Sequence, residues 1–405
     1  MQEQANISQG NVIGHYGIAG RDDQAPHTCS VIMPSILRPS IERAMHSIYA
    51  QTLTGTIQVM VGLDGGRERI SLLQKLINER PVHVAMTLLD PGYSTSRQRG
   101  GMHGAFDGGA LRTILSYAAN SALLANLDDD NWWAPDHLEG LVKAIEGKDW
   151  AFSKRWFVAP DGETVLCRDD WESVGPGKGV FLERFGGFSD TNTMLIDKTR
   201  LEHVLRLWGI PIAGEEHTGI GSDRNVFAAL KDRPFGASDL ASSYYVVDAE
   251  DAMQNSRVRR VREVLARDFD GFQAFQDGRF ADAADAFHRY MAIGPRSGLA
   301  LAWIALTRMR AGKGDDRQAL FAAPRESTIG DARDHAIDAL ANGWILEPSL
   351  VGKERCTLAF FSGQHALLGG DKATARKCFT ATIECGGDQN EARAARAELQ
   401  RLERG

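Results

Sequence analysis

The stretch that decides the fold runs from Ser121 to Trp133 and reads SALLANLDDDNWW. Its apolar first half is strand-like, and it leads into three consecutive carboxylates, Asp128, Asp129 and Asp130. Adjacent anions repel one another, so the cluster favours binding a cation, and hard oxygen ligands of this kind suit Mg²⁺ or Mn²⁺. The alternative is a solvated acidic turn in which Asp130 or Asn131 precedes the next helix.

Two earlier apolar runs predict strands that also end on turn residues. The run 29–33 stops at Pro34, and the run 57–63 ends on Asp64 and Gly65. Segments with apolar residues at helical spacing lie between the runs, which predicts right-handed βαβ units and a mainly parallel sheet. In such sheets ligands bind beyond the carboxyl ends of the strands. The acid cluster, Pro34 and Asp64 are therefore expected at one edge of the sheet.

The sequence after the acid cluster predicts further strands of the same α/β domain. Segments 150–158 and 163–167 are expected to pair as strands, and 243–247 is expected to be the last strand. A Gly-rich loop, 169–189, is either a lid that faces an acceptor or a surface excursion. Of the two tryptophans after the acids, we expect one in the core and one as a platform for the acceptor.

Composition restricts the class of protein. The chain has 405 residues, of which 43% are hydrophobic and 24% charged, as is typical of a soluble globular protein with two domains. A net charge of -7 argues against a nucleic-acid partner. The five cysteines form no C-x-x-C pair, so we expect a reduced, cytoplasmic protein rather than a disulfide framework or a zinc site. The apolar runs are too short to cross a bilayer, which leaves peripheral contact with the inner membrane face open.

The character of the sequence changes near Ser256, where a basic run leads into Ala-rich helical sequence. Small and aromatic residues recur there after Gly278 and again after Gly314, a spacing close to the roughly 34-residue period of tetratricopeptide repeats. The region resembles those repeats, and the alternative is an unrelated helical bundle. We expect three segments: an N-terminal tail (1–27), an α/β domain (28–256) and an α-helical tetratricopeptide-like domain (257–405).

Four pieces of the first domain carry a further resemblance. They are residues 30–34, 47–52, 61–65 and 127–138, which read SVIMP, SIYAQT, VGLDG and LDDDNWWAPDHL. In this order they resemble family 2 glycosyltransferases, enzymes of the GT-A fold that use nucleotide-diphosphate sugars and generally invert the anomeric configuration. The resemblance covers about residues 28–250 and implies an α/β GT-A domain with a mainly parallel sheet, followed here by the all-α region.

The resemblance implies donor-side roles for individual residues. Pro34 would line the nucleotide through its backbone, and Asp64 would read the base. Arg97 matches the arginine that precedes the helix leading to the acid cluster, and Asp129 would lie beside the nucleotide. One departure is Leu63, which stands where the family commonly has another acid.

The resemblance also implies the metal ligands and the catalytic base. Asp128 and Asp130 would form the Asp-x-Asp pair, Asp128 toward the ribose or a metal-bound water and Asp130 as the direct ligand of Mn²⁺ or Mg²⁺. Asp223 would take the proton of the acceptor hydroxyl. Ser222 stands where the family commonly has a glutamate, which leaves Glu215 and Glu216 as rival bases.

The implied reaction is metal-dependent transfer of a sugar, from a UDP-sugar by preference, to a hydroxyl of a glycan, a lipid-linked acceptor or a protein. The helical domain would serve a protein partner or self-association, and no nucleic acid is expected. One alternative is a sugar-phosphate nucleotidylyltransferase, which needs a Gly-rich basic loop after the first strand, unlike residues 34–38. Another is a non-catalytic repeat scaffold whose first domain is inert.

Overall fold

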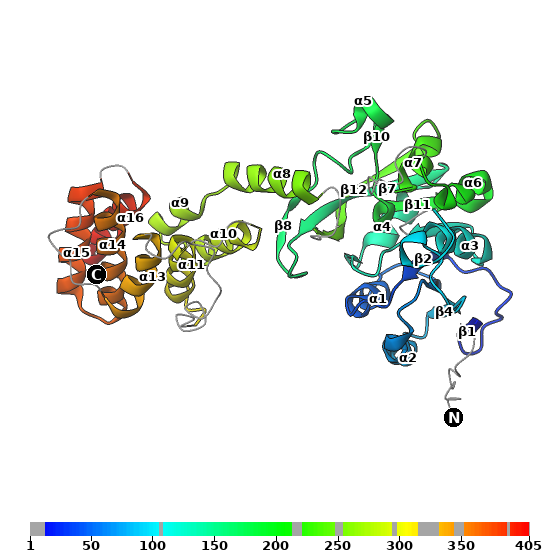
Figure 1. The fold of residues 1–405 in the computed structure, drawn as a ribbon, viewed down its shortest axis with the longest axis horizontal. Helices are drawn as coiled ribbons and strands as arrows, with labels where there is room; N and C mark the ends of the chain where they lie inside the picture. Colours follow the sequence, from blue (N-terminus) through cyan, green and yellow to red (C-terminus); the bar gives the residue numbers. More distant parts are fainter. Residues whose placement is uncertain are drawn as a thin grey trace. The chain divides into compact units, whose positions relative to one another are not determined.

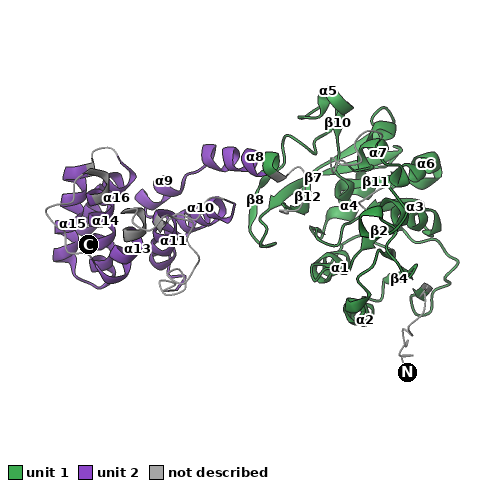
Figure 2. Ribbon diagram, in the orientation of Figure 1, with its two compact units in different colours: residues 1–257 green, residues 258–405 purple. Residues whose placement is uncertain are grey.

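A computed structural model of the protein describes residues 13–104, 108–212, 221–247, 254–293, 298–314, 332–343, 352–386 and 389–404. The chain divides into two compact units, residues 1–257 and 258–405 (Figure 2). The expected fold class is confirmed, because the first unit is α/β and the second is helical. Within the described part of the chain, no helix has both the length and the apolar character that crossing a bilayer requires.

One large sheet forms the centre of the first unit (Figure 1). In order across the sheet, its strands are β1 (Ile13–Tyr16), β4 (Val84–Leu89), β3 (Ile57–Leu63), β2 (Cys29–Ser35), β5 (Leu123–Asn126), β11 (Met194–Asp197), β7 (Trp150–Val158), β12 (Phe235–Val246) and β6 (Trp132–Trp133), with β8 (Val165–Arg168) beside β7. The neighbours β4, β3, β2 and β5 run parallel, as expected. Strand β11 lies antiparallel between β5 and β7, so the sheet is mixed beyond β5.

Helices cover both faces of this sheet (Figure 1). On one face α1 (Ile41–Tyr49), α2 (Ile70–Glu79) and α4 (His137–Ala144) share a core with Val31 and Met33 of β2. On the other face α3 (Gly109–Ala118) and the end of α6 (Lys198–Leu205) pack with Ile32. Alternate residues of a strand point to opposite faces, so β2 is buried at every position, as a central parallel strand must be.

Residues 13–16, which the sequence places in a polar tail, form the edge strand β1 antiparallel to β4. His15 Nδ1 lies 2.9 Å from the hydroxyl of Thr87. The Arg21 guanidinium donates to the carbonyls of Ala25 and Pro26 at 2.8 and 2.7 Å. The pairing with β4 and the contact with Thr87 hold the segment on the sheet, and the short sequence IGHY gives no sign of them.

The Gly-rich segment 169–189 is anchored at both ends by buried ion pairs. It contains β9 (Gly175–Pro176), α5 (Leu182–Phe185) and β10 (Gly187–Phe188). The fully buried Arg155 of β7 donates to Asp169 and Asp190 at 2.8 and 2.6 Å and pairs with Glu172 at 3.3 Å. Burial lowers the pKa of Arg155, but the three carboxylates outweigh burial and raise this pKa above its ordinary value. The ends of the segment therefore belong to the domain core.

Helix α8 (Gln254–Arg267) begins in the first unit. Its Arg257 is buried, donates to the carboxylate of Glu172 from Nε at 2.9 Å and to the Tyr245 hydroxyl at 2.8 Å. Burial raises the pKa of Glu172, but Arg155 and Arg257 together lower it to about 2. The first turn of α8 is thus tied by charge to the core of the α/β unit.

A chain that ends at residue 260 is expected to fold, because it keeps the pair between Arg257 and Glu172. A chain that ends at residue 253 removes one partner of this buried pair and is expected to lose about 3 kcal/mol of the free energy of unfolding. Urea unfolding of the two chains measures the difference. Equal stability of the two would show that Arg257 does not hold the α/β unit together.

Among its described residues the second unit is built of helices, in which each helix after α8 contacts the next and the last also contacts the first of this series. After α8 they are α9 (Gly271–Gln276), α10 (Phe280–Ala292), α11 (Gly298–Arg310), α13 (Ala332–Asn342), α14 (Gly352–Leu368), α15 (Lys372–Gly386) and α16 (Asn390–Arg404). Their core is aromatic, with Trp303 stacked on Phe287 at 5.4 Å. Gly363 lets α14 and α15 approach closely, because a Cβ there would lie 2.6 Å from the Phe379 ring. The tetratricopeptide assignment itself stays a prediction.

Candidate nucleotide-binding site

A cleft lies at the carboxyl edge of the parallel strands. The register pairs Pro34 with Gly62 and Ile32 with Asn126, so β2, β3 and β5 end side by side. Among the described residues, a cavity of about 220 Å³ at this edge is lined by Pro34, Ser35, Ile36, Arg38, Asp64, Arg99, Gly108, Asp128, Asp129 and Asp130. It brings together Pro34, Asp64 and all three aspartates of the acid cluster. Arg97 and Asp223 are not among its lining residues.

Helix α3 begins at the cleft, because Gly108, the residue directly before it, packs closely against Pro34. Gly108 has a φ of 72°, and a Cβ at this position would lie 2.7 Å from the Cβ of Pro34. Glycine alone accommodates both the left-handed backbone and this close approach. The first backbone N–H groups of α3 and its dipole therefore favour an anion at this side of the cleft.

Asp128 is held at both oxygens of its carboxylate. The buried Arg112 of α3 donates to Oδ1, and Nδ2 of Asn192 donates to Oδ2 at 2.8 Å. The backbone N–H of Asp128 donates in turn to Oδ1 of Asn192 at 2.6 Å. Burial opposes ionisation, but Arg112 and Asn192 outweigh it and lower the pKa of Asp128. Asp128 is therefore an ionised carboxylate with a fixed orientation.

Asp129 joins the loops that follow β2 and β5. Its carboxylate accepts hydrogen bonds from the Ser35 hydroxyl at 2.6 Å, the Ile36 backbone N–H at 3.2 Å and Arg38 at 2.6 Å. The residue is 2% exposed. These contacts use both of its oxygens to fix the shape of the cleft.

The negative charge of Asp130 is compensated less than that of Asp128. Its Oδ2 lies 3.3 Å from Nη1 of Arg38, and about a third of its side chain is exposed. Burial in the cleft, followed by the charges of Asp128 and Asp129, raises the pKa of Asp130 to about 7, although Arg38 opposes the shift. A cation beside Asp130 would relieve this repulsion.

Asp64 ties the end of β3 to the loop that carries two arginines. Its Oδ1 accepts from the backbone N–H of Thr95 at 2.6 Å and from the Thr95 hydroxyl at 2.8 Å. The loop continues into the short 3₁₀ helix η2 (Arg97–Arg99). Arg97 is exposed to solvent, whereas Arg99, two residues later, lines the cleft.

Asp223 is the first residue of helix α7 (Asp223–Leu230). Its Oδ2 accepts from Nη1 of Arg224 at 2.9 Å. The rival bases Glu215 and Glu216 lie outside the described residues. Of the three candidates, the structure thus places only Asp223.

Two contacts connect the start of α7 to the acid cluster. The hydroxyl of Ser222, directly before the helix, donates to the carbonyl of Trp208 at 2.6 Å. The guanidinium of Arg112 lies 5.7 Å from the centre of the Trp208 ring. Because Arg112 also holds Asp128, this arginine lies between the acid cluster and the start of α7.

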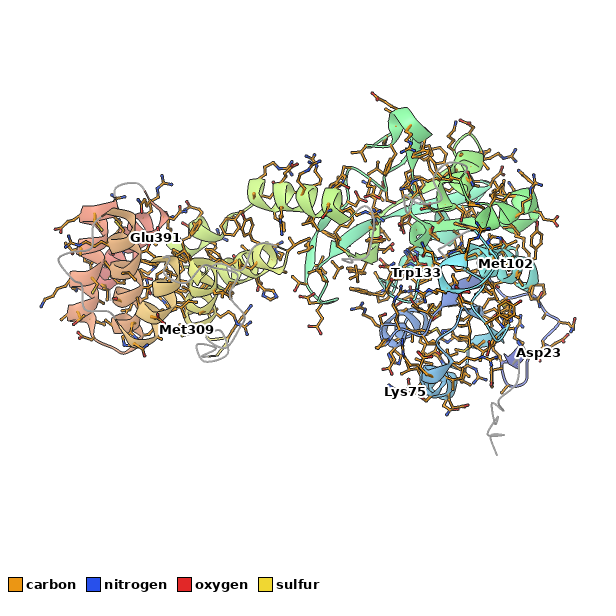
Figure 3. All side chains as sticks on the ribbon, viewed as in Figure 1. Asp23, Lys75, Met102, Trp133, Met309 and Glu391 are labelled. Carbon is orange, nitrogen blue, oxygen red and sulfur yellow. The ribbon has the colours of Figure 1, made fainter. Side chains whose placement is uncertain are left out.

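The two tryptophans after the acids pack within the domain. Trp133, labelled in Figure 3, is buried and donates from Nε1 to the carbonyl of Asn192 at 2.8 Å. Trp132 is partly exposed, with the guanidinium of Arg43 3.8 Å from its ring centre and the Tyr244 ring stacked on it at 5.1 Å. Trp133 is a core residue, and an acceptor role for Trp132 stays a prediction.

Sequence reasoning missed three residues that shape the cleft: Arg38, Arg112 and Asn192. Arg38 follows the end of β2 by three residues, and its position alone could have suggested it. Arg112 lies in a helical segment, where a charged residue on the buried face signals a carboxylate partner. Asn192 contacts Asp128 across 64 residues of sequence, and no local pattern links the two.

The donor set fits a divalent cation that arrives with a phosphate ligand. No group of three or more Asp, Glu, His or Cys side chains suited to a metal occurs among the described residues. Mg²⁺, however, usually takes one or two protein carboxylates and completes its coordination with water and substrate phosphate. Asp130 meets that requirement, whereas Asp128 is already engaged by Arg112 and Asn192.

No protein-family model matches the chain, and no curated protein matches it in sequence. Among solved structures, S. aureus TarS 1–349 has a TM-score of 0.40 and 13% identity, over 93% of this chain and 92% of that chain. A longer S. aureus TarS structure has a TM-score of 0.40 and 14% identity, over 88% of this chain and 55% of that chain. TarS 1–349 in complex with UDP-GlcNAc has a TM-score of 0.39 and 11% identity, over 93% of this chain and 92% of that chain.

Proposed function

We propose that the first unit is a family 2 glycosyltransferase of the GT-A type. It moves a sugar from a nucleotide-diphosphate sugar, a UDP-sugar by preference, to a hydroxyl of a glycan, a lipid-linked acceptor or a protein. The observation that carries the proposal is the cleft, in which Asp64 and the acid cluster meet beside the N-terminus of α3 at the ends of three parallel strands. A cytoplasmic location and a partner-binding or self-associating helical unit belong to the same proposal.

The residues of the cleft can bind a nucleoside diphosphate. The diphosphate is an anion, and Arg38, Arg99 and the N-terminus of α3 bring positive charge to the cleft. In this arrangement Pro34 and Asp64 face the base, Asp128 faces the ribose, and Asp129 holds Arg38 in place. Arg97 completes the donor side only if its exposed loop moves toward the cleft.

Asp130 would hold Mn²⁺ or Mg²⁺, with Asp128 beside it. When bound, such a cation neutralises the charge that develops on the leaving diphosphate. Arg38 would share this task, because its guanidinium lies between Asp129 and Asp130 and its side chain is 38% exposed. The chain thus offers both a carboxylate for the cation and a guanidinium for the phosphate.

Asp223 is proposed as the base that takes the proton from the acceptor hydroxyl. The bond from that oxygen to the anomeric carbon forms as the bond to the diphosphate breaks, so the configuration inverts. A retaining double displacement would need a second carboxylate as a nucleophile at the same carbon. A single positioned base contributes roughly two to four orders of magnitude in rate.

Nucleotide binding tests the proposal directly. UDP with Mn²⁺ at about 100 times its Kd is expected to stabilise the protein by about 2.7 kcal/mol and to raise Tm by several degrees. Differential scanning fluorimetry with UDP and Mn²⁺, UDP and EDTA, and uridine alone measures the shift. A protein whose Tm responds to no nucleoside diphosphate, with or without Mn²⁺, would refute the proposal. Stronger stabilisation by a nucleoside triphosphate would favour the nucleotidylyltransferase alternative.

A further inference from the structure

We infer that Asn192 is a positioning residue of the donor site, which holds Asp128 in the orientation that the nucleotide requires. The inference rests on the proposed function, since it needs Asp128 to contact the nucleotide or its cation. Asn192 is 1% exposed, lies in the 3₁₀ turn η3 (Thr191–Thr193) and does not line the cleft. It can therefore act only through a residue that does.

The side-chain amide of Asn192 holds Asp128 at two places. Its Oδ1 accepts from the backbone N–H of Asp128 at 2.6 Å, and its Nδ2 donates to the carboxylate Oδ2 of the same residue at 2.8 Å. The two bonds together fix the backbone and the side-chain rotamer of Asp128. Arg112 holds the other oxygen, so turning the carboxylate breaks at least one charge-assisted hydrogen bond.

Asn192 also fixes the far end of the turn that Asp128 begins. Its backbone carbonyl accepts from Nε1 of Trp133 at 2.8 Å, and Trp133 is buried. One residue therefore holds both ends of segment 128–133, which includes Asp130. Of these contacts, the ones made by the side chain of Asn192 reach Asp128, so a side-chain substitution acts on Asp128.

Asn192 is itself held in place by hydrogen bonds. The Oδ1 of Asp190 accepts from both the backbone N–H and the Nδ2 of Asn192, each at 2.9 Å. Asp190 in turn accepts from the fully buried Arg155 at 2.6 Å. A side chain locked by such contacts can pass the rigidity of the core to the residue it holds.

The chemistry of the position requires an amide of this length. The side chain must accept from one backbone N–H and donate to two carboxylates, those of Asp128 and Asp190. An aspartate here could not donate and would add a third anion, and a leucine of similar volume would leave buried polar groups without partners.

The test compares Asn192→Ala with Thr193→Val. Thr193 is a buried neighbour in the same turn, and its hydroxyl donates to the carbonyl of Asp190 at 2.7 Å without touching Asp128. Isothermal titration with UDP, with Mn²⁺ and with EDTA, gives the Kd of each full-length variant. Asn192→Ala is expected to weaken UDP binding about tenfold or more. Thr193→Val is expected to lower Tm but to leave the Kd within about twofold.

Two further measurements separate positioning from a structural role. The donor KM of Asn192→Ala is expected to rise about tenfold while the acceptor KM stays within about twofold. In an Asp128→Asn background, adding Asn192→Ala is expected to change the UDP Kd by less than about twofold, because Asn192 acts through Asp128. If Asn192→Ala does not fold, Asn192→Ser, which keeps one donor, is measured in the same cycle.

An Asn192 variant that binds UDP as tightly as the wild type would overturn the inference. So would multiplicative effects in the double variant, which would mean that Asn192 and Asp128 act independently. Failure of the wild-type protein to bind any nucleoside diphosphate is a different result, because it refutes the proposed function and, with it, the role of Asn192 in a donor site.

Discussion

Sugar transfer is expected to fall by about two to three orders of magnitude in Asp130→Asn, while the folded state becomes more stable. Both effects follow from the same carboxylate. It would supply the charge that holds the divalent cation, and its pKa is raised to about 7 by burial and by the neighbouring acids. Asparagine has nearly the same shape and carries no charge at any pH.

The sign of the stability change depends on pH. A carboxyl group whose pKa rises on folding from 3.8 to about 7 favours the folded state while it is protonated. That stability is complete below pH 3.8 and is lost as the pH rises through 7. At pH 8 the neutral Asn restores it, by on the order of 1 kcal/mol once the exposed third of the side chain is allowed for. At pH 5 the gain is expected to be smaller.

Asp129→Asn is the matched control, because it changes the adjacent acid in the same way. It removes the charge that Arg38 and Ser35 bind in a buried position, so the variant is expected to be less stable at both pH values. Tm at pH 8 and pH 5, with transfer rates at saturating donor, distinguishes the two variants. Wild-type rates in Asp130→Asn with EDTA present would exclude both metal dependence and the role of Asp130.

Asp223→Asn is expected to lower transfer by about two orders of magnitude or more and to leave the affinity for UDP unchanged. Asparagine keeps the shape of the side chain but cannot take a proton from the acceptor. Asp223 does not line the donor cleft, so nucleotide binding should not depend on its charge. UDP titration and single-turnover transfer on one preparation measure both quantities.

The control for Asp223 is another aspartate at a helix start. Asp197 caps α6 by accepting from the backbone N–H of Thr199 at 2.9 Å, and Asn is an equally good cap. Asp197→Asn is therefore expected to keep full activity. If Asp223→Asn also keeps it while Glu215→Gln or Glu216→Gln loses it, the base lies in the segment around residue 215.

The parts of the fold that the sequence predicts are those in which local pattern and burial agree. Strands β2, β3 and β5 are apolar runs that end near Pro34, Asp64 and Asp128, and parallel strands must end at one edge. This alone brings most of the donor side together. Strand β11 is a short apolar segment whose antiparallel place between β5 and β7 depends on partners far away in the chain.

The contacts that orient the site side chains could not be predicted in the same way. Asp129 sits in the middle of the acid cluster and is expected to lie beside the nucleotide, but no local pattern shows that it also links two loops through Ser35 and Arg38. The loop arginine expected at the donor side is Arg97, but the turn of η2 places Arg99 at the cleft. The sequence around the two arginines does not show which of them reaches the cleft, because the backbone turn that decides this depends on tertiary packing.

The burial of Arg257 limits how this protein can be recombined with others. Any exchange of the helical unit for a different module has to preserve the first turn of α8. Arg257 in that turn compensates the negative charge of Glu172 inside the α/β unit. A junction placed after residue 260 would carry this turn along with the α/β unit. The interchangeable part of the chain therefore begins within helix α8.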